Sequence, residues 1–157
     1  MFGKLDSTEI EQLISSQVIG RIGCHADDLT YIFPISYAYD GKYVYCLGQP
    51  GQKIDMLRKN PRLCFQVDDT TNLANWKSAI AWGTYEEISD PAARMAALRQ
   101  LHDRHLPVIT SATMHLSDQW PFGSDSQADV KGIIFRFALE QKTGRFERAG
   151  VENFFAS

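Results

Sequence analysis

The stretch of residues 29–47 constrains the fold more than any other part of the chain. Two runs rich in β-branched and aromatic residues, 29–39 (LTYIFPISYAY) and 42–47 (KYVYCL), flank the dipeptide Asp40-Gly41. Such side chains favour β-strands, and Asp-Gly is a strong signal for a tight hairpin turn. The stretch therefore predicts two neighbouring antiparallel strands.

Strand-like runs recur through the rest of the chain. Further strands are predicted at residues 18–25, 62–68, 76–88, 130–139 and 144–148. Gly83, inside one of these runs, is expected to mark a bulge or a close approach of another backbone. Polar or aperiodic residues at 69–75 and 107–128 predict loops, and the second is long enough to indicate a functional or mobile segment.

Three helices are predicted from the signals at their ends, at residues 7–17, 52–59 and 90–106. Thr8 with Glu11 matches the capping-box pattern at the start of the first helix. Asn60-Pro61 ends the second, because a residue before proline avoids the helical region. Asp90-Pro91 begins the third as a cap followed by proline at the first helical position.

The order of these elements predicts a mainly β (α+β) fold. Consecutive strands joined by tight turns give an antiparallel sheet, and the helices do not alternate regularly with strands as a doubly wound fold requires. Six or seven strands with short flanking helices would avoid open edges most simply by closing into a barrel. With 157 residues, the chain is expected to form one domain, residues 1–157.

Charge and hydropathy exclude several classes of function. The formal net charge is −3 and the 16 lysines and arginines are scattered, so no nucleic-acid partner is expected, because phosphate backbones bind clustered cations. No apolar run is long enough to span a bilayer. Acidic residues stand near the N-terminus where a secretory signal would be apolar. We therefore expect no membrane association and a cytoplasmic location.

The three cysteines, Cys24, Cys46 and Cys64, lie in strand-like runs and form no CxxC pair. This pattern predicts reduced, mostly buried thiols. Cys24, His25 and Cys46 do not follow a metal-binding spacing, and structural zinc takes four ligands. No metal site is expected.

Residues 48–59 (GQPGQKIDMLRK) place a glycine- and proline-rich turn directly before a short helix with Lys53 in its first turn. A helix N-terminus presents unpaired N–H groups and a partial positive charge, which attract phosphate. Acidic residues are usual in that turn, so an anionic ligand would explain the lysine. The alternative from this motif alone is an exposed lysine on a surface helix.

Five segments, in this order and spacing, resemble the pyridoxamine 5′-phosphate oxidase-like split-barrel flavoproteins, and most of all their nitroimidazole-resistance-like branch. The segments are IGRIG (19–23), FPISYAYDGKYVYC (33–46), PGQKIDMLRKNPRLCFQVDD (50–69), WKSAIAWGTYEEI (76–88) and KTGRFE (142–147). The third is the most specific, because a lysine, a short helix, Asn-Pro-Arg and a strand recur across this superfamily. The resemblance implies an antiparallel split β-barrel that binds flavin mononucleotide (FMN) at the interface of a homodimer.

The resemblance also assigns roles to residues. It implies that Lys53, helped by Gln52, binds the FMN phosphate, that the strand at 33–36 lies with its backbone against the isoalloxazine ring, and that Lys77 and Ser78 contact the ring's polar edge. The full set of implied cofactor-binding residues is Phe33, Pro34, Ile35, Ser36, Cys46, Gln52, Lys53, Lys77, Ser78 and Trp82.

Two of these residues allow a second reading, and a third departs from the pattern of the family. Pro34 removes an N–H from its strand, which suits either a flavin-facing position or an ordinary edge strand. Trp82 could pack on the ring or on the partner subunit, or be a cross-strand aromatic of the barrel. Cys46 stands where this branch often has a histidine near the flavin, so chemistry that depends on that histidine is not expected.

These features predict an FMN-dependent oxidoreductase that acts on a small molecule or takes hydride from a nicotinamide donor. No side chain stands out as a catalytic acid or base. The alternatives are a non-catalytic flavin-binding or sensing module, and a split barrel that uses haem or a deazaflavin. Haem would require an axial ligand such as histidine, and none of the four histidines is well placed by sequence.

Overall fold

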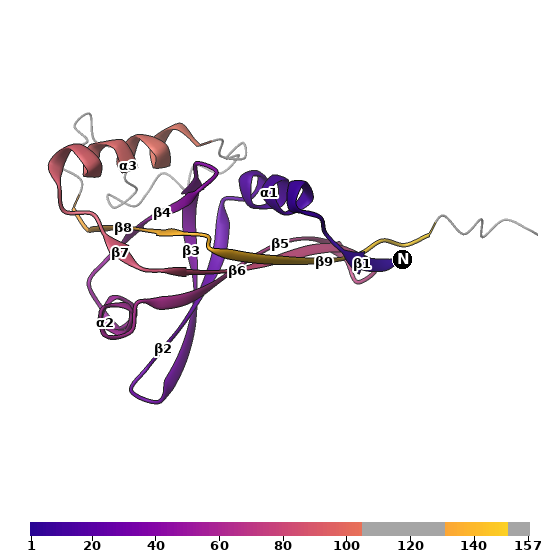
Figure 1. Cartoon of the computed structure of the whole chain (residues 1–157), viewed down its shortest axis with the longest axis horizontal. Helices are drawn as coiled ribbons and strands as arrows, with labels where there is room; N and C mark the ends of the chain where they lie inside the picture. Colours follow the sequence, from indigo (N-terminus) through magenta and orange to yellow (C-terminus); the bar gives the residue numbers. More distant parts are fainter. Residues whose placement is uncertain (105–130, 151–157) are drawn as a thin grey trace, which may run out of the picture.

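The computed structural model describes residues 1–104 and 131–150, so the predicted loop at 107–128 lies outside the described residues (Figure 1). Nine strands and three helices follow in chain order within the described part: β1 (Phe2–Lys4), α1 (Ser7–Ser16), β2 (Ile19–Ala26), β3 (Leu29–Tyr39), β4 (Tyr43–Gly48), α2 (Gln52–Lys59), β5 (Arg62–Asn72), β6 (Asn75–Thr84), β7 (Glu86–Glu87), α3 (Pro91–Asp103), β8 (Ile133–Ala138) and β9 (Gln141–Glu147).

All strands pair antiparallel, in the order β1-β9-β6-β5-β2-β3-β4-β8-β7. The predicted mainly β, antiparallel class is confirmed. The predicted count of six or seven strands is wrong, because β1 and β7 are too short to give a sequence signal. Within the described residues no pairing joins β7 to β1, so the strand ladders do not show the predicted closure into a barrel.

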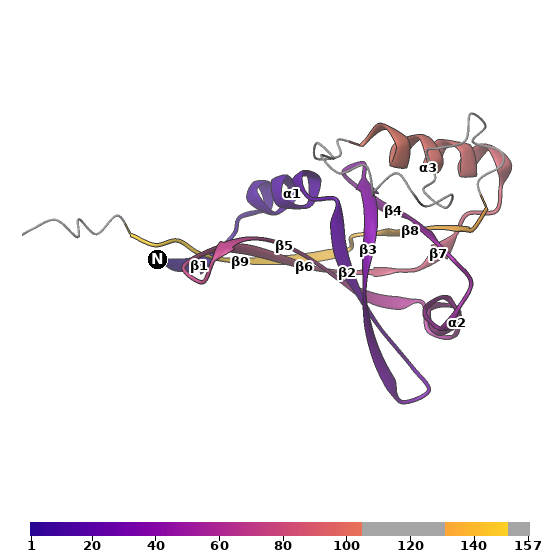
Figure 2. The same cartoon turned by 180° about the vertical axis from the view of Figure 1, so that it is seen from behind.

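The helices lie on opposite sides of the strands. In both views α1 and α3 lie on one side and α2 on the other, while the β2–β3 hairpin extends past α2 (Figures 1 and 2). The hairpin turns at Asp27 and Asp28, which both have positive φ angles of 50° and 62°, as a tight two-residue hairpin turn requires.

Two predicted element boundaries are wrong. Residues 69–75 are not a loop, because β5 continues to Asn72 and pairs Asp69 with Lys77 and Thr70 with Trp76. A strand can continue through polar residues when the neighbouring strand, here β6, supplies the backbone hydrogen bonds. The single strand predicted at 76–88 is interrupted at Tyr85, whose N–H donates to the Pro61 carbonyl at 2.7 Å and whose side chain is buried.

The predicted capping box of α1 is also wrong in its residues. Asp6 caps the helix: its side chain accepts from the Glu9 N–H at 2.8 Å, and the Glu9 side chain accepts from the Asp6 N–H at 2.9 Å. Thr8 already lies within α1. Glu11 instead accepts a hydrogen bond from Tyr39 at 2.6 Å and forms an ion pair with Lys142.

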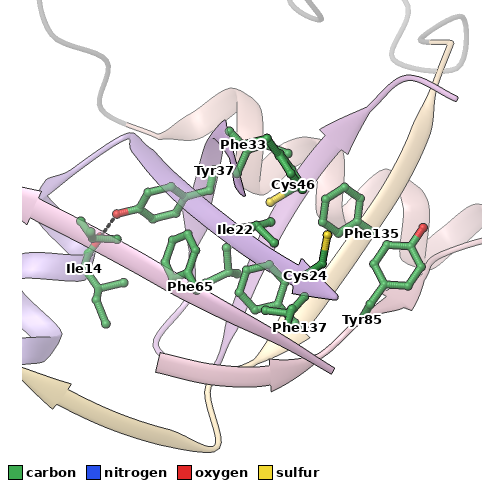
Figure 3. Close-up of a cluster of buried hydrophobic side chains, with 14 of the residues drawn as sticks. Ile14, Ile22, Cys24, Phe33, Tyr37, Cys46, Phe65, Tyr85, Phe135 and Phe137 are labelled. Carbon is green, nitrogen blue, oxygen red and sulfur yellow. Dashed lines mark hydrogen bonds between the residues drawn. The ribbon is translucent and has the colours of Figure 1, made fainter. Parts of the chain in front are cut away.

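The main core fills the space inside the curved sheet (Figure 3). Phe65 packs edge-on against both Tyr37 and Phe137, with ring centroids 5.1 and 5.3 Å apart. Tyr37 also donates its hydroxyl to the Ile14 carbonyl at 2.5 Å, which ties the last turn of α1 to β3. Full burial of each such side chain contributes about 1.5–3 kcal/mol. A second core cluster lies under α3 and includes Leu98 and Leu101.

Gly83 is a point of close backbone approach, as predicted. A Cβ atom at this position would lie 2.4 Å from the Ala138 carbonyl oxygen. The adjacent Trp82 carbonyl accepts from the Glu140 N–H at 2.9 Å. The backbone of β6 is therefore held directly against the end of β8.

Candidate functional site

β3 has one unpaired edge over most of its length. It pairs with β2 from Leu29 to Ser36, but with β4 only from Tyr37 to Tyr39. In the part of the chain that the structure describes, no strand pairs with the other edge of residues 29–36. Apart from the Ser36 carbonyl, which bonds to β4, this edge offers backbone hydrogen-bonding groups that the described strands do not use.

The hydrogen bonds at the end of this stretch show which residues face the open edge. Tyr37 donates its N–H to the Val18 carbonyl at 3.0 Å, toward β2. Because backbone groups of successive residues alternate in direction, Phe33 and Ile35 also face β2. Pro34 and Ser36 face the open edge. Proline at position 34 therefore removes no ladder bond, which explains why β3 tolerates it.

The side chains of this stretch alternate between the core and the opposite face of the sheet. Phe33 and Ile35 are buried in the core, whereas Pro34 is exposed and Ser36 is half-buried. The residues facing the open edge therefore present mainly backbone groups to it.

The N-terminus of α2 lies beside the same strand. Lys53 is half-buried, with Nζ 5.2 Å from the centroid of the Phe33 ring. Among the ion pairs formed by the described residues, none involves Lys53. Lys53 is thus a cation held against an aromatic ring without a carboxylate to neutralise it.

The first turn of α2 also retains free donors. Gly51 is its N-cap and supplies no side-chain hydrogen bond, and the first helical bond runs from the Asp55 N–H to the Gly51 carbonyl at 3.0 Å. The N–H groups before Asp55, including that of exposed Gln52, have no partner within the helix and point out of its N-terminal end. A Cβ atom at Gly51 would meet nothing within 4 Å, so the space in front of the helix end is open.

Cys46 lies in the core next to this region, and its thiol is not exposed. It is fully buried and sits opposite Tyr37 in the β3–β4 pair. Burial raises the pKa of the Cys46 thiol far above its ordinary value, although the charges of Arg104 and Lys53 oppose this shift. The thiol therefore stays protonated near neutral pH.

Ser78 and Trp82 lie elsewhere, on the side of β2, β3, β5 and β6 that faces away from the core. We call this side the outer face. The Ser78 hydroxyl accepts from the Gln66 amide at 3.0 Å, and half-buried Trp82 stands opposite Cys64. Lys77, their neighbour on β6, points to the opposite face, because adjacent strand residues alternate.

A groove of about 610 Å³ runs along the outer face. Its apolar floor includes Ile32, Cys64 and Trp82, and Arg21 and Arg62 stand among its polar lining residues. Both arginines are paired within the chain, Arg21 with Asp68 at 2.9 Å and Arg62 with Glu140 at 2.7 Å. The outer face therefore combines exposed apolar surface with charges that are already neutralised.

The structure thus divides the predicted site residues into groups. Phe33, Cys46 and Lys53 gather where β3, β4 and α2 meet. Ser78 and Trp82 lie on the outer face, which they share with Pro34 and Ser36, while Lys77 points away from it. One chain does not bring all of these residues around a single ligand.

Sequence reasoning missed Arg104. Its guanidinium, at the end of α3, donates to the Tyr37 carbonyl at 3.1 Å and influences Cys46 electrostatically. No sequence signal links positions 67 residues apart. The position of the open edge gave no sequence signal either, because it depends on where β4 stops pairing with β3.

Comparisons with known proteins agree with this architecture. The family model described as pyridoxamine 5′-phosphate oxidase matches residues 6–145. An uncharacterised protein from Rhizobium meliloti is 30% identical over 142 residues, which cover 90% of this chain and 93% of the relative.

Solved structures share the fold. The crystal structure of an FAD-binding protein from Mesorhizobium loti has a TM-score of 0.73 at 27% identity, covering 95% of this chain and 98% of the other. A candidate 5-nitroimidazole antibiotic resistance protein from Bacteroides thetaiotaomicron has a TM-score of 0.68 at 20% identity, covering 93% of this chain and 87% of the other.

The antiparallel sheet and these structural neighbours define a protein of the split-barrel class. Within that class, the chain belongs to the pyridoxamine 5′-phosphate oxidase family. The helices of the described residues include none that is both long and apolar enough to cross a membrane. All three cysteines are free thiols, with Cys24 and Cys46 buried and Cys64 half-buried, as predicted.

Proposed function

We propose that this protein binds a flavin nucleotide, with the phosphate at Lys53 and the N-terminus of α2 and the ring along the open edge of β3. The observation that carries the proposal is the contact between Lys53 and Phe33. It joins the cation expected to hold the phosphate to the strand expected to hold the ring.

The groups present fit the chemistry of a flavin. A phosphate ester needs a cation and convergent N–H donors, which Lys53 and the uncapped turn after Gly51 supply. The ring carries an imide edge, an N–H between two carbonyls, which needs a donor and an acceptor side by side. Ser36 supplies the donor from its backbone N–H at the open edge, while its carbonyl accepts from the Leu47 N–H in the β3–β4 ladder.

FMN is the proposed form of the cofactor. The first turn of α2 carries one cation, Lys53, which suits one phosphate. The Mesorhizobium loti relative binds FAD, which contains the same ring and first phosphate and would use the same groups. The mass of the cofactor released from purified protein decides between the two forms.

We further propose a homodimer of the nitroimidazole-resistance-like type, with the flavin between the subunits. The outer face exposes Ile19, Ile32 and Ile80 around the groove. Its arginines are neutralised within the chain, so two copies can meet there without repulsion between like charges. A partner would bring its own Ser78 and Trp82 to the interface.

The proposed activity is that of an oxidoreductase, because a bound flavin supplies two-electron redox chemistry and the protein supplies binding and orientation. No described side chain at the site acts as an acid or base, since Cys46 is buried and His25 lies on the outer face, hydrogen-bonded to Thr30. This lack of a proton-transfer group keeps a non-catalytic flavin module as the second candidate.

An absorbance spectrum of the purified protein tests the proposal directly. Bands of oxidised flavin are expected, whereas a haem or deazaflavin spectrum, or a colourless protein that takes up no added flavin, would refute it. Bleaching by NADH or NADPH, with turnover on an added electron acceptor, supports the oxidoreductase. Bound flavin without any turnover supports the sensing module.

A further inference from the structure

The open edge of β3 presents an interrupted row of hydrogen-bonding groups. Ile32, Pro34 and Ser36 all face it, because they alternate with the residues that bond to β2. Ile32 offers an N–H and a carbonyl, whereas Ser36 offers its N–H alone, because its carbonyl accepts from the Leu47 N–H in the β3–β4 ladder. Pro34 offers a carbonyl alone. The middle of the edge is therefore a lone acceptor.

A lone acceptor distinguishes the two redox states of a flavin. In the oxidised ring, N5 is unprotonated and accepts hydrogen bonds. Reduction by two electrons places a proton on N5, which then donates. The carbonyl of a residue that has no N–H of its own can accept from the protonated N5 and offers nothing to the unprotonated one.

We propose that Pro34 tunes the bound flavin by withholding a backbone donor beside Ser36, so that the edge of β3 favours the reduced ring. This inference rests on the proposed function, since it requires a flavin at this edge. It adds a role for one residue, which acts through a missing N–H group rather than through its side chain.

Pro34 has a competing role to be separated from this one. A proline on an open edge also discourages pairing with a strand of another molecule. If Pro34 served only to prevent strand addition, substituting it would change the assembly of the protein and leave the flavin's midpoint potential unchanged. The two roles therefore differ in what a substitution changes.

The first experiment measures the midpoint potential of the flavin bound to Pro34→Ala, by titration with dithionite in the presence of a reference dye. The new N–H stabilises the oxidised ring, so the ratio of the affinities for reduced and oxidised flavin is expected to fall about tenfold. This corresponds to a potential about 30 mV more negative for two electrons. Ile32→Ala is the matched control, because Ile32 faces the same edge, is exposed, and keeps its N–H.

If Pro34→Ala aggregates, a second variant can still refute the inference, because it tests whether the ring lies at this edge at all. Ser36→Pro removes the remaining donor next to position 34 without removing a bond to β2. It is expected to weaken flavin binding at least tenfold relative to Ile32→Ala, which faces the same edge and keeps its N–H.

The outcomes separate this inference from the proposed function. If the wild type binds no flavin, both fail. If flavin binds and Ser36→Pro weakens its binding, but Pro34→Ala leaves the potential unchanged, the proposed function stands and the role of Pro34 is overturned. If flavin binds and neither variant differs from its control, the ring lies elsewhere and the role of Pro34 is overturned with that placement. A potential that moves to more positive values in Pro34→Ala also overturns it.

Discussion

The N-termini of α1 and α2 differ in how their exposed N–H groups are satisfied. At α1, Asp6 and Glu9 form a reciprocal capping box within the chain. At α2, Gly51 contributes no cap, and Lys53 adds a positive charge where an acidic residue is usual. The first helix end is complete in itself. The second is suited to an anion, and the following predictions test that difference.

The largest effect is expected from Lys53→Ala. Loss of a charge-assisted contact to phosphate costs about 1.5–3 kcal/mol, which weakens flavin binding about 10- to 100-fold. Lys42→Ala is a close control, because Lys42 also lies over an aromatic ring, 5.1 Å from the Tyr43 centroid, yet belongs to no helix end. Isothermal titration with FMN measures both. Equal losses in the two variants would place the phosphate elsewhere.

Gly51→Asp makes α2 resemble α1. The position is open, so the side chain fits, and the new cap should raise the unfolding free energy by about 0.3 kcal/mol. The same carboxylate repels the phosphate and should weaken flavin binding about tenfold.

Gly51→Asn is the neutral control for this change. It provides a cap without a charge, so its flavin affinity should stay closer to that of the wild type. Unchanged affinity in Gly51→Asp, measured in the same titration, would show that this helix end does not hold an anion.

Asp6→Ala tests the other helix. Removing the cap of α1 should lower the unfolding free energy by about 1 kcal/mol in a denaturant titration. Flavin affinity should not change, because this helix end is satisfied within the chain. A parallel loss of flavin would mean that α1 takes part in the site.

The smallest effect concerns pH. Burial alone would raise the pKa of Glu11 on α1, but hydrogen bonds from Lys142 and Tyr39 outweigh it and hold the pKa below its usual value. The ionised carboxylate therefore stabilises the fold at pH values above the pKa of the unfolded state, about 4.3. This contribution is lost as the pH falls through the lower pKa of the folded state.

Glu11→Gln should accordingly flatten the acid side of the stability profile, measured as thermal midpoints between pH 3 and 6. Flavin binding at neutral pH should be unaffected. An acid profile identical to that of the wild type would show that Glu11 does not contribute.

Most elements of the fold could be predicted from sequence, because their signals are local. The Asp40-Gly41 turn, the α2 helix with its Asn60 end, and the strand around Pro34 are all present. The strands β1 and β7 could not be predicted, since two or three residues carry no periodic pattern and exist only because a neighbouring strand pairs with them.

The candidate site was predictable only in part. The proximity of Lys53 to the Phe33 strand followed from a resemblance, and the structure places them together. The separation of Lys77 from Ser78 follows from strand alternation. The open edge depends on where β4 stops pairing with β3, and that is decided by tertiary structure rather than by any residue in β3.

The contact at Gly83 has a consequence for how a ligand would be received. Because β6 and the end of β8 touch backbone to backbone, we expect little pivoting of the sheet at this junction. We therefore expect this part of the sheet to keep its shape before any ligand arrives. Binding to a rigid, preorganised frame costs little free energy of reorganisation, so a cofactor should bind without a preceding hinge motion.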